Sequence, residues 1–265
     1  MKVNEHHAIS TPNLLLVPYS THHVPTYHDW MSDPALQTAT ASEPLTLEEE
    51  YSMQISWRED NDKLTFIICL PLASRPSTSQ NPQPTPSLQA GIDDGPERMI
   101  GDINLFLFPF EADGEDDRDE TASELPRNDA GVIGEIELMI GRRDLQRKGF
   151  GRAALLTFLD HILENWGAIY TEYRPDPGHD RTVAKTFSAE RGKGVMQLAY
   201  LRAKIQESNV GSIALFESVG FVRTSARANY FGEVELRLGA PERGWQDQPR
   251  AQGTETLVYK EVCSG

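Results

Sequence analysis

The sequence predicts a single α/β domain, and three observations support this fold class. Short apolar runs with the length and alternation of strands recur along the chain, at residues 14–18, 65–69, 100–108, 133–140, 198–205 and 233–238. Segments with helical spacing lie between several of these runs. Polar segments without periodicity fall between the elements and not inside them. A chain of 265 residues with 38% hydrophobic residues can form a core even when such segments are discounted.

The N-terminal half begins with a strand and two short helices. Residues 14–18 indicate an edge strand that ends at Pro18, because proline cannot donate a hydrogen bond to a ladder. Short helices are expected at 24–31 and 46–57. The second opens with Thr46-x-x-Glu49, a pattern in which each side chain can cap the backbone of the other residue.

The C-terminal half has the order strand, helix, strand, helix, strand. The strand 133–140 leads through a glycine-rich turn to a helix at 152–166. That helix carries apolar residues along one face, at Leu155, Leu159, Ile162, Leu163 and Trp166. Residues 198–205 alternate apolar and polar side chains as a strand does, and 211–219 indicate a short helix. Because the apolar residues of the long helix 152–166 lie along one face, we expect that face to pack on the sheet.

Three insertions interrupt the domain, which we place at residues 10–240. The first, 71–98, is rich in Pro, Ser, Gln and Thr and cannot bury enough apolar area to offset chain entropy. The second, 111–130, is acidic, and the third, 170–196, contains Pro, Gly and mixed charges. All three are expected to be disordered. The tail, 241–265, carries no pattern that we interpret.

The negative charge of the chain is concentrated in one insertion. The formal net charge is −15, and residues 111–124 hold eight acidic residues with one arginine. Such a run indicates a solvated loop, or an electrostatic collar that attracts a cationic acceptor. An acidic chain lacks the surplus of Lys and Arg that phosphate contacts require, so we expect no nucleic-acid partner.

The sequence is typical of a protein of the cytoplasm or nucleus. No 18-residue apolar stretch could span a membrane, so no membrane partner is expected. The N-terminal residues lack the apolar core of a secretory signal. Two cysteines, Cys69 and Cys263, do not make a disulfide framework.

The turn between the strand 133–140 and the long helix predicts a phosphate site. It has the sequence Gln146-Arg147-Lys148-Gly149-Phe150-Gly151. The first N–H groups of a helix have no partner inside the helix, and the positive end of its dipole favours an anion. The two glycines allow close approach of the backbone. Five cations surround the turn, at Arg142, Arg143, Arg147, Lys148 and Arg152.

Other phosphate-binding loops fit the turn less well. The P-loop pattern Gly-x-x-x-x-Gly-Lys-Ser/Thr is absent. Gly149-x-Gly151-x-x-Ala154 does match a dinucleotide fingerprint, and Glu172 lies near the position that would bind a ribose hydroxyl. That fingerprint directly follows a strand, whereas here the polar residues 142–148 intervene.

The turn resembles the Arg/Gln-x-x-Gly-x-Gly/Ala signature of the Gcn5-related N-acetyltransferases, the GNAT superfamily. Asn209-x-x-Ser212 and the later Gly220-Phe221 resemble the closing motif of the same family. Further segments are similar to its N-acetyltransferase 9 branch: Leu15-x-Val17-Pro18-Tyr19, His23-Val24-Pro25-x-Tyr27-His28-x-Trp30-Met31, 40–46, Gly101-Asp102-x-Asn104-Leu105-Phe106 and Gly134-Glu135-Ile136-Glu137.

The resemblance implies a GNAT-type domain and acetyl-CoA as co-substrate. In this fold helices cover both faces of a mixed sheet whose fourth and fifth strands splay apart. The diphosphate of acetyl-CoA would bind the turn and helix start, residues 146–152, and its pantetheine arm the strand at Leu138, Met139 and Ile140. Asn209 and Ser212 would orient that arm, although a helix cap explains this pair equally well. The branch implies a protein or peptide amine as acceptor, with an association with tubulin or microtubules.

Transfer to an amine requires the free base, and two glutamates are candidates to accept the proton. A lysine with a pKa of about 10.4 is neutral at pH 7 in about one molecule in a few thousand, whereas an N-terminal amine near 8 is neutral in roughly a tenth. Glu135 and Glu137 alternate with apolar residues, so both point from one face of the strand. Alternatively, they face solvent or pair with Arg202 or Lys204 of the next strand.

The remaining candidate residues complete the functional expectation. Many family members carry a tyrosine that protonates the leaving thiolate where this chain has Phe216, so the acid is unassigned among Ser212, Tyr200 and Tyr230. A CoA-binding or protein-interaction module without turnover is therefore the alternative function. Glu43 lies in the segment expected to bind the acceptor, or it only shapes the entry to a helix. The histidines lack the spacing of metal ligands, and no metal is expected.

Overall fold

The chain folds around one open mixed sheet. The computed structural model describes residues 1–40, 42–72, 87–110, 131–173, 197–239 and 250–260. The sheet of these residues has ten strands in the order β4-β10-β1-β2-β3-β5-β6-β7-β9-β8. Their bounds are β1 His7–Ser10, β2 Leu15–Pro18, β3 Lys63–Cys69, β4 Ser87–Gln89, β5 Met99–Pro109, β6 Gly131–Ile140, β7 Gln197–Gln206, β8 Val222–Arg223, β9 Glu233–Gly239 and β10 Glu255–Lys260.

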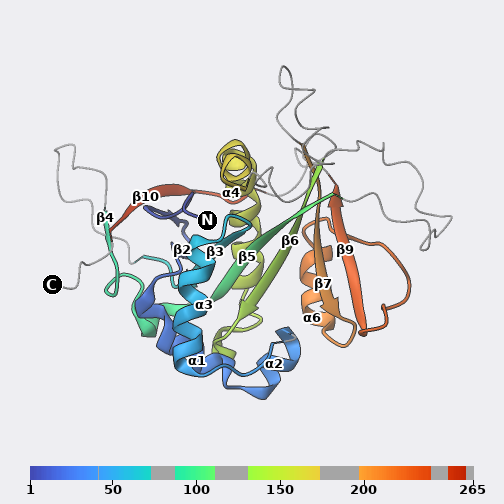
Figure 1. The fold of residues 1–265 in the computed structure, drawn as a ribbon, viewed down its shortest axis with the longest axis horizontal. Coiled ribbons are helices and arrows are strands. Elements are labelled where there is room, and N and C mark those ends of the chain that lie inside the picture. The colour runs from blue at the N-terminus through green and yellow to red at the C-terminus, as the bar shows by residue number, and fades with distance from the viewer. Residues whose placement is uncertain (41, 73–86, 111–130, 174–196, 240–249, 261–265) are drawn as a thin grey trace.

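Helices cover both faces of this sheet, as the sequence predicted (Figure 1). On one face lie α1 (Val24–Met31), α2 (Pro34–Thr40) and α3 (Leu47–Glu59). On the other lie α4 (Phe150–Tyr173) and α6 (Val210–Glu217). The strands divide their side chains accordingly: Phe66 and Ile68 pack with α4, while Ile67 and Cys69 pack with α1. This alternation places two apolar cores on opposite sides of one sheet.

Local sequence signals account for the ends of the helices. Thr46 caps α3 by accepting from the N–H of Glu49, and the Glu49 carboxylate accepts from the N–H of Thr46 at 2.8 Å. The predicted capping box is thereby confirmed. The amphipathic helix predicted at 152–166 is the middle of α4, and its apolar face, including Leu155 and Ile162, is buried.

Two predictions about the N-terminal half and the tail were wrong. Residues 14–18 do not form an edge, because β2 pairs with both β1 and β3. The domain does not end at 240, because β10 pairs with β1 and with β4. Both errors come from short strands: β1 has four residues, and β10, with six, joins the sheet only through strands that are far away in sequence.

The predicted insertions lie mostly outside the described residues. All of 111–130, half of 71–98 and most of 170–196 fall there. Two parts are ordered, however. The segment from β4 to the short 3-10 helix Pro96–Arg98 packs on the domain with Leu88 and Asp94 buried, and α4 continues to Tyr173. No helix among the described residues is long and apolar enough to cross a membrane.

Candidate active site

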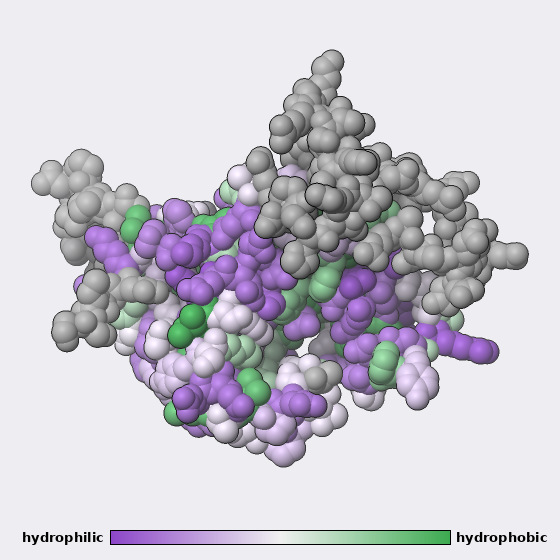
Figure 2. Space-filling view, viewed as in Figure 1, coloured by the Kyte–Doolittle hydropathy of each residue, from purple (hydrophilic) through white to green (hydrophobic). Residues whose placement is uncertain are grey.

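The site forms where two parallel strands part. β6 and β7 are hydrogen-bonded from Gly131 to Glu135 of β6, and no pairing joins residues 136–140 to β7. The strands diverge toward their carboxyl ends, where α4 and α6 both begin (Figure 1). In Figure 2 the surface is hollowed between the side that carries α1 and α2 and the side that carries β7 and β9. The carboxyl ends of parallel strands are where open α/β sheets bind ligands, and we call this opening the cleft.

The turn from β6 into α4 has an unusual backbone. Gln146 donates its Nε2 hydrogen bond to the Ile140 carbonyl at 2.9 Å and so holds the turn to the end of the strand. Arg147 has a φ of 59° and Gly149 a φ of 91°, both in the left-handed region. Glycine adopts that region freely, but arginine does so at a cost, and such residues cluster at functional sites.

The N–H groups of residues 147–152 have no hydrogen-bond acceptor among the residues that the structure describes. The first bond of α4 runs from Ala153 N to Gly149 O, and none of these six N–H groups donates to any described residue. Residues 146–149 and Arg152 are exposed. Six free donors at the positive end of a 24-residue helix fit an anionic group well.

The structure divides the five cations around the turn into two groups. Arg142 donates to both carboxylate oxygens of Asp144, at 3.0 and 2.7 Å, and Arg143 pairs with Asp33. Arg147, Lys148 and Arg152 form no ion pair with any described residue. The three cations nearest the free N–H groups therefore remain available to an anion.

Behind the turn, residues 136–140 of β6 pair with β5 on one edge and have no strand partner on the edge that faces β7. Leu138 and Ile140 are half-buried beside α4, and Met139 is buried on the opposite face. A Cβ atom added to Gly151 would lie 3.1 Å from Leu215 Cδ2 and 3.6 Å from Leu138 Cδ2. A residue without a side chain at 151 thus lets α4 begin close to this strand and to α6.

Asn209 and Ser212 lie at the start of α6, across the cleft from the turn. Asn209 is the cap of that helix, and its Oδ1 accepts from the N–H of Ser212 at 3.1 Å. The cap predicted as the alternative role is confirmed. It leaves the Asn209 amide N–H₂ and the Ser212 hydroxyl without a protein partner among the described residues.

The two candidate glutamates occupy different environments. Glu135 lies where β6 still pairs with β7, and its Oε2 accepts from Arg202 Nε at 2.6 Å, with Lys204 Nζ 3.5 Å away. This carboxylate already has a charged hydrogen-bond partner on the next strand. The expected alternative, pairing with the next strand, is therefore observed for Glu135.

Glu137 lies beyond the last pairing with β7 and has no ion pair with a described residue. Solvent reaches its side chain, yet removal of water by the surrounding protein raises its pKa to about 7, and the charges of Glu135 and Asp102 add to the rise. A base with a pKa near the working pH can both accept and release a proton, which is what general-base catalysis requires. Glu137 is thus the better placed of the two.

The candidates for the general acid differ in how they lie relative to the cleft. Phe216 is buried and packs edge-on against Phe221 at 5.0 Å between ring centres. Tyr200 pairs with Ile133 at the joined end of β6 and β7, away from the splayed end, and the Arg237 guanidinium lies 4.4 Å over its ring. Tyr230 is 96% exposed. Of the hydroxyl groups named from sequence, only that of Ser212 lies on an element that begins at the cleft.

Glu43 is exposed in the connection between α2 and α3. No hydrogen bond or ion pair joins it to the described residues of the cleft. Glu43 thus lies in the connection between the first helices, where the sequence predicted it, and it has no partner among the described residues of the cleft.

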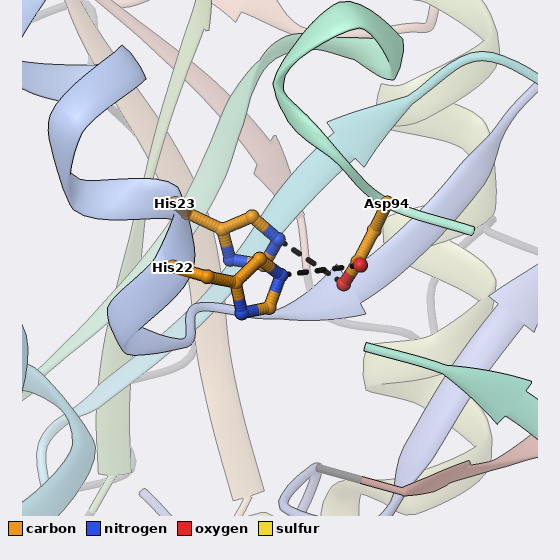
Figure 3. A group of neighbouring side chains, drawn as sticks. All are labelled: His22, His23 and Asp94. Carbon is orange, nitrogen blue, oxygen red and sulfur yellow. Dashed lines mark hydrogen bonds and ion pairs between the residues drawn. The ribbon is translucent and has the colours of Figure 1, made fainter. Parts of the chain in front are cut away.

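One group of side chains outside the cleft has the composition of a metal site. His22, His23 and Asp94 converge near the start of α1, as Figure 3 shows. Each histidine Nε2 lies 3.1 Å from one oxygen of Asp94. The spacing of the histidines did not predict this group, because its carboxylate comes from the segment 71–98.

The hydrogen bonds of this group fit a structural network better than a metal centre. The Nδ1 atom of His23 accepts from the Ser20 N–H at 3.0 Å, so the single proton of the neutral ring is on Nε2, which donates to Asp94. A metal would need that nitrogen deprotonated. Burial lowers the pKa of His23 and keeps the ring neutral. Tyr259 of β10 donates to Asp94 at 2.7 Å, so the network ties the C-terminal strand to α1.

Asp102 and Asn104 were not among the functional candidates named from the sequence. Both are buried, and they lie on the same face of the sheet as Glu137 of the neighbouring strand β6. Burial raises the pKa of Asp102 to about 7. The available signal was two polar residues at alternate positions in an otherwise apolar strand, which places both on the same face.

Comparisons with known proteins agree with this geometry. The sequence profile of the family described as "Acetyltransferase (GNAT) domain" matches residues 13–222. The N-acetyltransferase 9-like protein of Schizosaccharomyces pombe is 36% identical over 244 residues, covering 90% of this chain and 98% of that protein. The alpha/beta-tubulin-N-acetyltransferase 9 of Drosophila melanogaster is 36% identical over 250 residues, covering 94% and 95%.

Solved structures show the same fold. A GNAT-family acetyltransferase from Bacillus anthracis has a TM-score of 0.50 at 11% identity, over 88% of this chain and 98% of that chain. The structure of AAC(6′)-Ib in complex with ribostamycin and coenzyme A also has a TM-score of 0.50 at 11% identity, over 89% and 94%.

Proposed function

The chain belongs to the GNAT acetyltransferase family, in its N-acetyltransferase 9-like branch, and is an acetyl-CoA-dependent N-acetyltransferase; we propose that it acetylates an amine of a protein or peptide by direct attack on the thioester. The observation that carries this proposal is the set of six free N–H groups at the start of α4, beside the opening between β6 and β7. Acetyl-CoA supplies the activated acetyl group, and the residues of the cleft bind and orient it and move protons.

The start of α4 is the proposed binding site of the CoA diphosphate. The N–H groups of residues 147–152 donate to it, and the unpaired Lys148 and Arg152 add positive charge. Gln146 fixes the turn and Gly149 supplies its left-handed backbone. Arg147 and Phe150 contribute through their N–H groups, and Gly151 through the space it leaves.

The pantetheine arm is proposed to lie along the unpaired end of β6. Amide groups of such an arm can bond to a free strand edge as a further strand would. Leu138, Met139 and Ile140 provide that edge, since β7 has left it. The Asn209 amide N–H₂ and the Ser212 hydroxyl lie on the other wall of the cleft, at the start of α6.

Glu137 is the proposed general base. It accepts one proton from the acceptor ammonium, and the freed lone pair attacks the acetyl carbon. Glu135 instead pairs with Arg202 and lies near Lys204, so we do not propose it as the base. The Ser212 hydroxyl is our candidate for contact with the leaving sulfur, because Phe216 cannot donate a proton.

An exposed aromatic pair marks a surface for the acceptor. Tyr230 and Phe231 are 96% and 74% exposed and stack edge to face in the connection before β9, which is paired with β7 of the cleft wall. Exposed aromatic residues favour contact with a polypeptide. Glu43, on the α2–α3 connection, is proposed to bind a positive charge of the acceptor.

Tubulin is the proposed acceptor to test first. Several relatives carry the name alpha/beta-tubulin-N-acetyltransferase 9, and this chain is 32% to 36% identical to them. We propose a cytoplasmic location, where such a partner would be found. The test is release of CoA thiol when full-length protein is given acetyl-CoA and peptides with the N-terminal or internal lysine sequences of tubulin, with mass spectrometry to place the acetyl group.

The second candidate function is a CoA-binding interaction module without turnover. It is favoured by one observation, the buried Phe216 at the position where the family often has a proton donor. Binding of CoA together with no thiol release on any peptide amine would select the module and refute the transferase. Thiol release that requires a free amine would select the transferase.

A further inference from the structure

Polar side chains lie next to one another on one face of the sheet, from β3 across β5 to Glu137 of β6. Thr65 of β3 lies opposite Asn104 of β5, and Asn104 lies opposite Glu137 of β6. Side chains directly opposite on one face approach to about 5 Å between Cβ atoms. Asp102 precedes Asn104 by two residues and therefore shares this face, diagonal to Glu137. The four side chains therefore lie on one face of the sheet, in neighbouring positions that end at Glu137.

Asp102 is a buried carboxyl group with only one side-chain partner. It is 2% exposed, and its Oδ2 accepts from Asn104 Nδ2 at 2.7 Å. Its Oδ1, the Oδ1 of Asn104 and the Oγ1 of Thr65 have no hydrogen-bond partner among the described residues. A buried carboxylate is normally paired with a cation or fully hydrogen-bonded, because losing its water is costly. A neutral, protonated Asp102 would meet this requirement.

The groups around the two carboxyls are anionic or neutral on nearly every side. Facing Asp102 are Tyr27 of α1 and Tyr19 after β2, and both tyrosines also face Glu50 of α3, whose carboxylate lies 3.9 Å from His28. Facing Glu137 are Glu135 on its own strand, Glu233 of β9 and Lys204 of β7. Lys204, the one cation among these, already lies 3.5 Å from Glu135. After burial, Asp102 is the largest charge that raises the pKa of Tyr27, and Glu137 acts on the same hydroxyl.

Two carboxyls that are diagonal neighbours on one face of a sheet repel each other when both are ionised, so the titration of one depends on the charge of the other. We propose that Asp102 and Glu137 hold a single proton between them in the resting enzyme, with Asp102 as the positioning residue that sets the proton affinity of Glu137. The proposal rests on the proposed function, in which Glu137 is the base, and it adds a residue that does not touch the substrate.

The proton balance of the reaction then involves both carboxyls. The acceptor ammonium gives one proton to the pair, the amine nitrogen forms its bond to the acetyl carbon, and the carbon–sulfur bond breaks with its electrons on sulfur. The second amine proton goes to the sulfur. The pair, now holding two protons, returns one to solvent. Asn104 keeps Asp102 in its orientation throughout by the 2.7 Å hydrogen bond.

The test is titration of the two side chains by ¹³C NMR of the carboxyl carbons in the full-length protein without substrate. In Asp102→Asn the Glu137 midpoint should move to lower pH by about one unit, because a neighbouring negative charge is removed. In Glu137→Gln, which alters a solvent-accessible residue, the Asp102 midpoint should fall by the same amount, since coupling is reciprocal. Asp160→Asn, a change at a nearly buried carboxyl on α4, should move neither.

The outcomes separate this inference from the function on which it rests. An unmoved Asp102 midpoint in Glu137→Gln overturns the pair, whatever the activity. Coupled midpoints in a protein that releases no CoA thiol support the pair and refute the transferase. In an active enzyme the pair predicts that Asp102→Asn also moves the acid limb of kcat/KM to lower pH. A purely structural role would lower the rate and leave that midpoint in place.

Discussion

Replacing Asp102 by asparagine should stabilise the protein at alkaline pH and hardly change it at acid pH. Asn104 Nδ2 donates to Asp102 Oδ2, so a proton on Asp102 would be on Oδ1, which has no other partner. An asparagine in the same position keeps the accepting oxygen and puts an N–H₂ group where the protonated Oδ1 would be. Asp102→Asn therefore mimics the neutral acid inside the fold.

The size of the effect follows from the shifted titration. Burial raises the pKa of Asp102 from 3.8 to about 7. Between these values the folded protein binds a proton that the unfolded chain has lost, so the free energy of unfolding falls as pH rises from about 4 to 7. At about 1.4 kcal/mol per pH unit, the wild type loses on the order of 4 kcal/mol across this window through Asp102 alone. The asparagine variant avoids that loss.

Urea unfolding at pH 5 and pH 8, followed by circular dichroism, measures the difference directly. We expect Asp102→Asn to exceed the wild type in free energy of unfolding at pH 8 by a margin that shrinks by 1 kcal/mol or more at pH 5. Asp160→Asn is the matched control: its carboxylate accepts from Arg250 Nη1 and Ala251 N, both at 2.8 Å, so the change should destabilise at both pH values. An equal effect of Asp102→Asn at pH 5 and 8 would refute the assignment of a neutral acid.

Three further predictions concern activity and stability. Glu137→Gln should lower kcat about 10²- to 10⁴-fold with little change in CoA affinity, because it removes a proton acceptor and no binding contact. The acid limb of the wild-type kcat/KM profile should have its midpoint near the Glu137 pKa of about 7. Steady-state measurement of thiol release gives both quantities. Thr46→Ala removes the cap of α3 and should cost about 1 kcal/mol in urea unfolding, an effect that Thr46→Ser should largely restore. Tyr259→Phe removes a 2.7 Å hydrogen bond to the buried Asp94 and should cost about 1.5 to 3 kcal/mol; amide exchange should then rise first in β10, and unchanged protection there would contradict the role of the network.

The parts of the fold that the sequence predicted are those with local signals. The apolar run, the turn with Gly149 and Gly151, and the amphipathic α4 follow one another within about 40 residues, and each has its own periodicity or capping pattern. By contrast, Asp94 and Tyr259 are 165 residues apart, and no local pattern brings them together. The strand β10 joins the sheet only through such distant contacts, and β1 is only four residues long, so both were missed.

The candidate site divides in the same way. The free N–H groups of the α4 start could be inferred from sequence, because every helix leaves its first N–H groups without internal partners. The different roles of Glu135 and Glu137 could not, because they depend on the residue at which β7 leaves β6. The burial of Asp102 depends likewise on the packing of α1 and α3 over the sheet, which no strand pattern specifies.

Calorimetry with CoA and with pantetheine, which lacks the diphosphate, tests most directly whether the start of α4 binds CoA. The wild-type protein should bind CoA with measurable heat and pantetheine far more weakly, and Lys148→Ala and Arg152→Ala should weaken only the binding of CoA. Equal affinity for the two compounds, or no heat with CoA, would show that the free N–H groups of residues 147–152 do not bind the diphosphate.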